Sequence, residues 1–194
     1  MKLIKLVVAS HNDGKIKEIK AMLAPFNIEV QSAKELHLSD VEETGTTFEE
    51  NAKIKAQGIS LMCGLPCLAD DSGLCVDALD GRPGVYSARY APNRDFDKGM
   101  SILLKEMSES KNKSRKAHFS CCLALAMPNE KTKIFEGKVE GEIADKPSGK
   151  SGFGYDPVFI PEGYTQTFAE LGNDIKNKIS HRGRALEKFI NELK

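Results

Sequence analysis

The sequence has no excess of either charge and no long apolar run. Lys and Arg together number 28, as do Asp and Glu, so the formal net charge is zero. Nucleic-acid-binding proteins usually carry a basic excess, so this balance argues against that class. Every apolar run is shorter than the ~20 residues that span a membrane. We therefore expect a protein that binds neither nucleic acid nor membrane, in which local basic residues can still hold a small anion.

Metal-binding cysteine patterns are also missing. The five cysteines are an odd number without a C-x-x-C pair, and the four histidines are scattered, so we expect no zinc site. Free thiols are typical of the cytoplasm, which is the compartment we expect. Residues 3–9 follow Lys2 and faintly resemble a signal peptide, but Lys5 interrupts the apolar run and polar residues end it early.

The chain length of 194 residues suits one large domain with a buried core. Residues 3–9 predict a buried strand. Ile16, Ile19, Leu23 and Phe26 then recur at helical spacing, with Pro25 near the end, which predicts a helix directly after that strand. We find no internal repeat, and we treat residues 1–194 as a single domain.

Further along the chain, residues 46–49 fit a capping box that opens a helix ending at Gly64. Short strands are predicted over residues 67–69 and 74–76. Apolar residues alternate over 117–125, which predicts a long strand with a partner over 134–139. Early βαβ units followed by paired long strands favour an α/β fold with a mixed sheet.

Residues 10–15 connect the first strand to the first helix. Such a loop presents free backbone N–H groups and the positive end of the helix dipole, which suit a phosphate. Lys15 adds a mobile cation, and Ser10 and Asn12 can donate side-chain hydrogen bonds. The alternative is an ordinary capped turn with a solvated lysine. The candidate phosphate loop comprises Ser10, His11, Asn12, Asp13, Gly14 and Lys15.

Two acidic pairs, Glu42-Glu43 and Asp70-Asp71, could bind a hard cation. The second pair follows the predicted strand over 67–69, and ligands of α/β sheets bind beyond such strand ends. Adjacent carboxylates repel each other, so a cation would relieve them. Mg²⁺ suits one or two protein carboxylates together with substrate phosphates. A carboxylate left free could deprotonate a water. The alternatives are a solvated acidic turn and a surface pair of glutamates.

A glycine-rich loop near the C-terminus carries aromatic and acidic residues. Phe153 or Tyr155 could stack on a base, at ~1–3 kcal/mol by analogy with single-strand binders, and Asp156 could accept from a ring N–H. His181 and Arg182 lie at a predicted helix start, where a cation opposes the helix dipole. A bound anion or keto oxygen would explain them. The alternatives are aromatic side chains in the core and a salt bridge.

Taken together, these segments resemble the inosine triphosphate pyrophosphatase family, the pyrophosphatases of non-canonical purine nucleoside triphosphates. The resemblance runs from Val7 to Leu186 and rests on ordered motifs at comparable spacing. His11 is the clearest departure, because many relatives carry a small residue there. The motifs are the S-x-N-x-x-K loop, Thr47-Phe48-Glu49-Glu50-Asn51-Ala52, Ala69-Asp70-Asp71-Ser72-Gly73-Leu74, Gly84-Val85-Tyr86-Ser87-Ala88-Arg89-Tyr90, Gly152-Phe153-Gly154-Tyr155-Asp156-Pro157 and Ile179-Ser180-His181-Arg182-Gly183.

The resemblance implies an elongated two-lobed α/β fold, with a mixed central β-sheet flanked by helices and the active site in the cleft between the lobes. It implies an enzyme, usually a homodimer, that uses Mg²⁺. The implied reaction hydrolyses ITP, dITP or XTP to the monophosphate and pyrophosphate, which clears these compounds from the nucleotide pool.

The resemblance also assigns roles to residues. Asp71 is the implied general base, and Glu42, Asp70 and Asp71 are the implied metal ligands. Whether Glu42 or Glu43 faces the metal is open. The implied substrate-binding residues are Ser10, His11, Asn12, Asp13, Gly14, Lys15, Lys55, Ser72, Phe153, Gly154, Tyr155, Asp156, Lys176, His181 and Arg182.

Selectivity against ATP is expected at position 6 of the purine. Arg182 or a backbone N–H can donate to a keto oxygen but not to an amino group, and an unpaired buried donor costs ~1–3 kcal/mol. Three other interpretations stay open. A different nucleotide phosphohydrolase would release orthophosphate, a non-catalytic nucleotide sensor would show no turnover, and an RNA-binding module would show a steep salt dependence.

Overall fold

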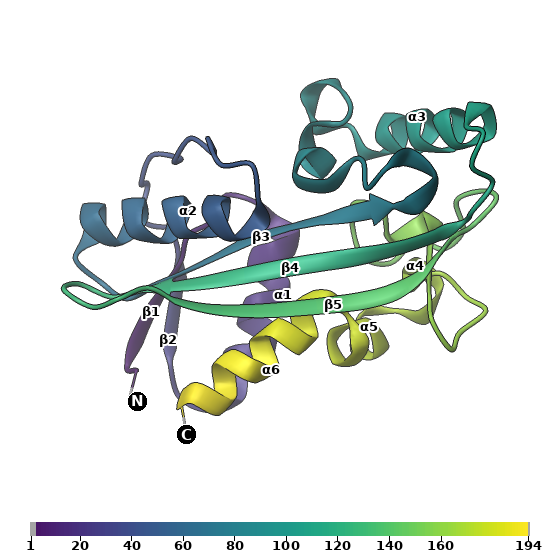
Figure 1. The fold of residues 1–194 in the computed structure, drawn as a ribbon. Helices are drawn as coiled ribbons and strands as arrows, with labels where there is room; N and C mark the ends of the chain where they lie inside the picture. Colours follow the sequence, from purple (N-terminus) through teal and green to yellow (C-terminus); the bar gives the residue numbers. More distant parts are fainter. Residues whose placement is uncertain (1–2, 194) are drawn as a thin grey trace. The chain divides into compact units, whose positions relative to one another are not determined.

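The computed structural model describes residues 3–193 and contains one mixed sheet (Figure 1). The strand order is β2-β1-β3-β4-β5-β6. β1 pairs in parallel with β2 and β3, whereas β5 and β6 are antiparallel. The predicted α/β class with a mixed sheet is confirmed. The strands are β1 (Lys5–Val8), β2 (Glu29–Ser32), β3 (Cys67–Val76), β4 (Lys116–Ala126), β5 (Lys133–Ile143) and β6 (Phe159–Pro161).

The chain divides into two compact units, each assembled from separate segments. One boundary falls between Asp71 and Ser72 inside β3, and another falls between His181 and Arg182. Two of the motifs singled out in the sequence are therefore divided between the units. Unit 1 comprises Met1–Asp71, Cys121–Gly137 and Arg182–Lys194, and unit 2 comprises Ser72–Ser120 and Lys138–His181.

The helices of unit 1 begin and end close to their predicted positions. The first is α1 (Asp13–Leu23), which continues into a 3₁₀ turn, Ala24–Phe26. The capping box of α2 (Phe48–Cys63) uses Thr47 and Glu50, one residue later than predicted. Thr47 has the extended backbone of an N-cap, with φ −124° and ψ 158°, and its side chain accepts from the N–H of Glu50. Gly64, the predicted end of this helix, is the C-cap that follows Cys63, and α6 spans His181–Leu193.

The strands of unit 1 bury both faces, because successive side chains point to opposite sides of a sheet. Leu6, Leu68 and Leu123 pack with residues of α1 and α6, and we call this side the α1/α6 face. Val7 and Ala69 belong to the cluster that includes residues of α2, on what we call the α2 face. Figure 1 shows α2 and α6 on opposite sides of the strands.

Unit 2 is built around aromatic side chains. The rings of Phe119, Phe159 and Phe168 contact one another, and the Phe159 centroid lies 4.7 Å from that of Phe119 and 5.4 Å from that of Phe168. Met100 and Leu103 also pack into this core. The helices of this unit are α3 (Phe96–Glu109), α4 (Phe168–Leu171) and α5 (Asn173–Ile179), with 3₁₀ turns at Asp77–Leu79, Gly84–Arg89, Pro92–Arg94 and Asp156–Val158.

One prediction about the strands is wrong in a way that matters for the site. The two short strands expected over 67–69 and 74–76 are one continuous strand, β3. Asp70 and Asp71 therefore lie within a strand rather than in a turn beyond it. Aspartate disfavours strands by itself, but local surroundings override this weak preference. None of the helices within residues 3–193 is long and apolar enough to cross a membrane.

Candidate active site

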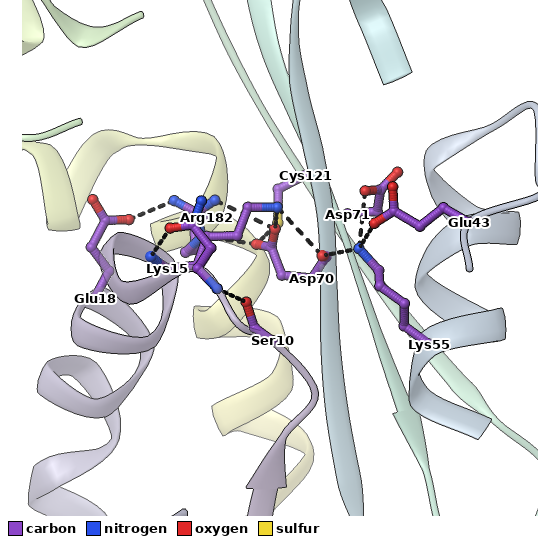
Figure 2. A network of polar contacts seen from close by, with 10 residues as sticks. Ser10, Lys15, Glu18, Glu43, Lys55, Asp70, Asp71, Cys121 and Arg182 are labelled. Carbon is purple, nitrogen blue, oxygen red and sulfur yellow. Dashed lines mark hydrogen bonds and ion pairs between the residues drawn. The ribbon is translucent and has the colours of Figure 1, made fainter. Parts of the chain in front are cut away.

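The candidate site of unit 1 is centred on two adjacent carboxylates in β3. Asp70 and Asp71 are only 1% and 5% exposed. Their side chains point to opposite sides of the strand (Figure 2). Following the alternation from Leu68 and Ala69, Asp70 lies on the α1/α6 face and Asp71 on the α2 face. Buried carboxylates need partners, and each face supplies its own.

Asp70 is surrounded by donors. The Lys15 ammonium lies 2.5 Å from Oδ1, and the Arg182 Nε–H donates to Oδ2 across 2.8 Å. The Cys121 thiol donates to Oδ2 as well, across 3.1 Å. Burial alone would raise the pKa of Asp70, but Arg182 and Lys15 outweigh it and hold that pKa well below its usual value. Asp70 is therefore ionised at neutral pH and anchors the cations around it.

Arg182 joins this anchor to a second carboxylate. The guanidinium is 2% exposed, and its Nη1 lies 2.5 Å from Oε2 of Glu18 on α1. Burial alone would lower the pKa of Arg182, but Asp70 and Glu18 raise it. Glu18 was missed by the sequence analysis. Its spacing from Lys15 was the available signal, since residues three apart on a helix share one face.

The α2 face holds Asp71 differently. The Lys55 ammonium lies 3.1 Å from Oδ1 of Asp71 and 2.7 Å from Oε1 of Glu43. Burial alone would lower the pKa of Lys55, but Asp71 and Glu43 raise it. The other oxygen of Asp71, Oδ2, has no hydrogen-bond partner within residues 3–193. Burial raises the pKa of Asp71. This carboxylate is therefore the one equipped to take a proton.

The two faces are connected through the backbone. The carbonyl oxygen of Asp70 accepts from Lys55 across 2.8 Å and from Lys15 across 3.4 Å (Figure 2). A lysine from α1 and a lysine from α2 thus share one acceptor in the middle of β3. Lys15 and Lys55, both predicted to hold phosphates, flank the same peptide group.

The oxygens around Lys55 fit a hard cation. Its ammonium touches carboxylate oxygens of Glu43 and Asp71 and a carbonyl oxygen, the donor types that Mg²⁺ prefers. Glu42 is exposed, so the structure favours Glu43 for this position. No group of three or more His, Cys, Asp or Glu residues that could hold a metal ion is found within residues 3–193. Mg²⁺ in proteins is often held by one or two carboxylates together with substrate phosphates. Glu42, Asp70 and Asp71 as ligands, and the magnesium itself, stay predictions.

The predicted phosphate loop is a capped turn at the start of α1. Ser10 Oγ accepts from the N–H of Asn12, and Asn12 Oδ1 accepts from the N–H of Lys15, each across 3.1 Å. The His11 ring contacts the carbonyl of Leu38 at 3.0 Å. Gly14 lies in the first turn of α1, next to Asp13, whose carboxylate is exposed and paired with Lys34. Substrate binding by residues 10–15 stays a prediction, and Lys15 is the member that reaches the carboxylates.

Unit 2 contains a separate charged group from the glycine-rich loop. The Lys176 ammonium lies 2.6 Å from Oδ2 of Asp156 and 4.5 Å from the ring centroid of Phe153. The same oxygen accepts from the N–H of Phe153 across 2.8 Å. Gly152 allows this approach, because a Cβ there would lie 2.1 Å from Oδ2 of Asp156 and its φ is +77°. Unit 2 thus brings together three of the predicted nucleoside-binding residues.

Other residues of unit 2 that were predicted to bind substrate pack against or hydrogen-bond to neighbouring residues of the protein. Tyr155 is buried, packs edge-on against Phe96 at 5.6 Å and donates to the carbonyl of Ser87. Gly154, with φ +67°, lies beside the same Phe96 ring. His181 is buried and stacks on Phe119, with centroids 4.6 Å apart. Ser72 is half-buried in β3. The substrate contacts assigned to these residues, and base recognition by Arg182, stay predictions.

Comparison with known proteins identifies the family. The model of the Ham1 family matches residues 6–192. The dITP/XTP pyrophosphatase of Bacillus licheniformis is 50% identical over 187 residues, which are 95% of each chain. A HAM1 protein from Coxiella burnetii has a solved structure with a TM-score of 0.90 and 42% identity, covering 98% of each chain. The Staphylococcus aureus Ham1 protein gives 0.85 and 40%, covering 98% of this chain and all of the other. The chain belongs to the Ham1 family.

Proposed function

We propose that the protein is a nucleoside triphosphate pyrophosphatase that hydrolyses non-canonical purine nucleotides such as dITP, XTP and ITP. The products are the nucleoside monophosphate and pyrophosphate. A curated relative that is 50% identical over 95% of the chain has the name dITP/XTP pyrophosphatase. The observation that carries the proposal is the Asp71 carboxylate, which has one oxygen held by Lys55 and one without a hydrogen-bond partner among residues 3–193.

Asp71 is the general base in this proposal. Its Oδ2 accepts a proton from water, and the water oxygen bonds to the α-phosphorus. The bond from that phosphorus to the α–β bridging oxygen breaks, and pyrophosphate leaves with the electron pair. A raised pKa suits this role, because proton transfer is most effective when the pKa of the base approaches the working pH.

Lys15 and Lys55 supply positive charge for the phosphates. Both ammonium groups lie at the Asp70 peptide group, so anionic oxygens placed there meet two cations. Magnesium, held by Glu43 and Asp71, would neutralise further phosphate charge when bound. The acidic pairs and the family resemblance support magnesium dependence, the resemblance alone supports a homodimeric state, and the free thiols support a cytoplasmic location.

Recognition of the base belongs to the polar groups predicted for the nucleoside. Phe153 is half-buried, and Asp156 and Lys176 lie beside it. Donors that match a 6-keto oxygen would disfavour ATP, whose 6-amino group cannot accept. Substrate preference should therefore follow the substituent at position 6 of the purine.

Product analysis tests the proposal. Purified protein is incubated with dITP, XTP, ITP, GTP and ATP in Mg²⁺, and in EDTA as a control. We expect monophosphate and pyrophosphate from dITP, XTP and ITP, little turnover of ATP, and none in EDTA; the rate with GTP, which also has a 6-keto oxygen, shows how much the substituent at position 2 adds to selectivity. Orthophosphate as the product would indicate a different phosphohydrolase. Binding of dITP without turnover would indicate a nucleotide sensor. Full activity in EDTA would refute the role of the metal.

A further inference from the structure

Glu18 is a buried carboxylate outside every motif that suggested the function. It lies on α1 and is only 8% exposed. A buried carboxylate is costly unless charged or hydrogen-bonding partners compensate it. One such partner is Arg182, whose Nη1 donates to Oε2 of Glu18 across 2.5 Å. Burying an ion pair is costly, so this pair is a candidate for a role in the adjacent site of Asp70 and Asp71.

Arg182 connects Glu18 to the β3 carboxylates. Its Nε–H donates to Oδ2 of Asp70 while Nη1 contacts Glu18 (Figure 2). The guanidinium is rigid and planar, so fixing one nitrogen fixes the direction in which the others point. The three residues come from α6, β3 and α1, elements far apart in the sequence but adjacent in unit 1.

Charge balance gives Glu18 a second task. Lys15 and Arg182 both pair with Asp70, so two cations meet one carboxylate. Glu18 contributes the second negative charge, which leaves these four groups formally neutral. Without that charge, the Arg182 guanidinium would move closer to Asp70 and compete with Lys15. The carbonyl of Asp70, to which Lys55 is bonded, would move with it.

We propose that Glu18 is a positioning residue for the hydrolysis. It holds Arg182, Arg182 holds Asp70, and the Asp70 peptide group sets the position of Lys55 and of the next residue, Asp71. This inference rests on the proposed function, in which Asp71 is the base. This series of contacts ends at Asp71, the base, so removal of Glu18 should change the turnover step more than substrate binding.

Kinetics of Glu18→Ala and Glu18→Gln test this role with dITP and Mg²⁺. Glu18→Ala should lower kcat by about 10- to 100-fold, the scale expected when a distant change misplaces a catalytic group, with KM changing less than about threefold. Glu18→Gln keeps an oxygen that can accept from Arg182 but loses the charge, so its kcat should lie between those of Glu18→Ala and the wild type. Glu187→Ala, an exposed glutamate of α6, is the matched control and should behave as the wild type.

The outcomes separate this inference from the proposed function. A wild-type protein that releases no pyrophosphate would refute the function itself. An active wild type with unchanged kcat in both Glu18 variants would overturn the positioning role, even if their melting temperatures fell. If Glu18→Ala does not fold, Glu18→Gln decides alone, and a kcat equal to wild type overturns the proposal. A rise in KM at constant kcat would also contradict it.

Discussion

The two faces of β3 treat neighbouring carboxylates in opposite ways. On the α1/α6 face, Asp70 meets Lys15, Arg182 and a thiol, and its pKa is held well below the usual value. On the α2 face, Asp71 meets one ammonium and keeps an oxygen without a hydrogen-bond partner within residues 3–193, and burial raises its pKa. One carboxylate is fixed as an anion, and its neighbour can exchange a proton.

Strand geometry makes this division possible. Two carboxylates on the same face would repel each other, and one pKa would rise at the expense of the other. Alternation along β3 instead gives each carboxylate its own cations, from α1 and α6 on one side and from α2 on the other. The residues remain adjacent in the chain, so the anchored side chain of Asp70 fixes the backbone from which Asp71 projects.

The largest expected effect is on turnover and comes from Asp71→Asn. The amide keeps the shape of the carboxylate but cannot accept the proton, so kcat should fall by about 10²- to 10⁴-fold. Nucleotide binding should persist, because Lys15 and Lys55 remain. Rapid-quench measurement of pyrophosphate and equilibrium binding of dITP check the two parts. A variant with half the wild-type kcat would remove Asp71 from the base role.

Asp70→Asn removes the anion of the α1/α6 face, and we expect it to lower the free energy of unfolding. The change leaves Arg182 and Lys15 without their shared anion, and breaking a buried ion pair costs about 3–5 kcal/mol. Urea denaturation at pH 7 measures this loss. Asp71→Asn is the control and should lose much less, because the charge it removes is one that burial disfavours. Equal losses for the two variants would contradict the division between the faces.

The same variant carries a pH signature. The folded pKa of Asp70 is lowered from the ordinary value of 3.8, so its stabilisation is complete above that value and is lost as pH falls through the lowered pKa. The wild type loses this contribution in acid, whereas Asp70→Asn has none to lose. The difference in unfolding free energy between them should therefore shrink below about pH 3.8. If the difference in unfolding free energy between the wild type and Asp70→Asn instead grew in acid, the pKa of Asp70 would not be lowered by folding.

Two adjacent glutamates sharpen the comparison on the α2 face. Glu43 contacts Lys55, whereas Glu42 is exposed. Glu43→Gln should raise the Mg²⁺ concentration needed for half-maximal activity by roughly tenfold or more, by analogy with other losses around metal sites. Glu42→Gln is the matched control and should change it less than about twofold. A larger increase in the required Mg²⁺ concentration for Glu42→Gln than for Glu43→Gln would instead assign the metal to Glu42, the ligand implied by the resemblance.

Much of this fold follows from periodic patterns in the sequence. The helices ending at Leu23 and Gly64 and the long β4–β5 pair have strong apolar periodicity, so their positions were predictable. The continuity of β3 was not. Asp70-Asp71-Ser72 has the composition of a turn, and only cations from distant segments make it a buried strand. Local strand propensity does not predict a contact with a lysine that lies fifteen residues away in the sequence, as Lys55 does from Asp70.

The sequence identified most residues of the site, but it did not show which of them pair with one another. Lys15, Lys55 and the aspartates were identified, but pairing of Arg182 with Glu18 joins residues 164 positions apart, beyond any local pattern. Tyr155 shows the converse difficulty. A tyrosine in a glycine-rich loop fits a base-stacking role or a core position equally well, and only the packing against Phe96 shows that it belongs to the core.

The smallest expected effect is a difference in unfolding free energy between serine substitutions at two adjacent cysteines of β4, one on each face of the sheet. Cys121 points to the α1/α6 face and donates to Asp70, whereas Cys122 lies among alanines and Ile59 on the α2 face. A serine hydroxyl at position 121 can replace the thiol donor, so Cys121→Ser should change the unfolding free energy by less than about 1 kcal/mol. Cys122→Ser buries a hydroxyl in an apolar cluster and should cost about 1–3 kcal/mol. Urea denaturation of both variants measures the difference, and a larger loss for Cys121→Ser would show that the polar character of the Asp70 side has been misassigned.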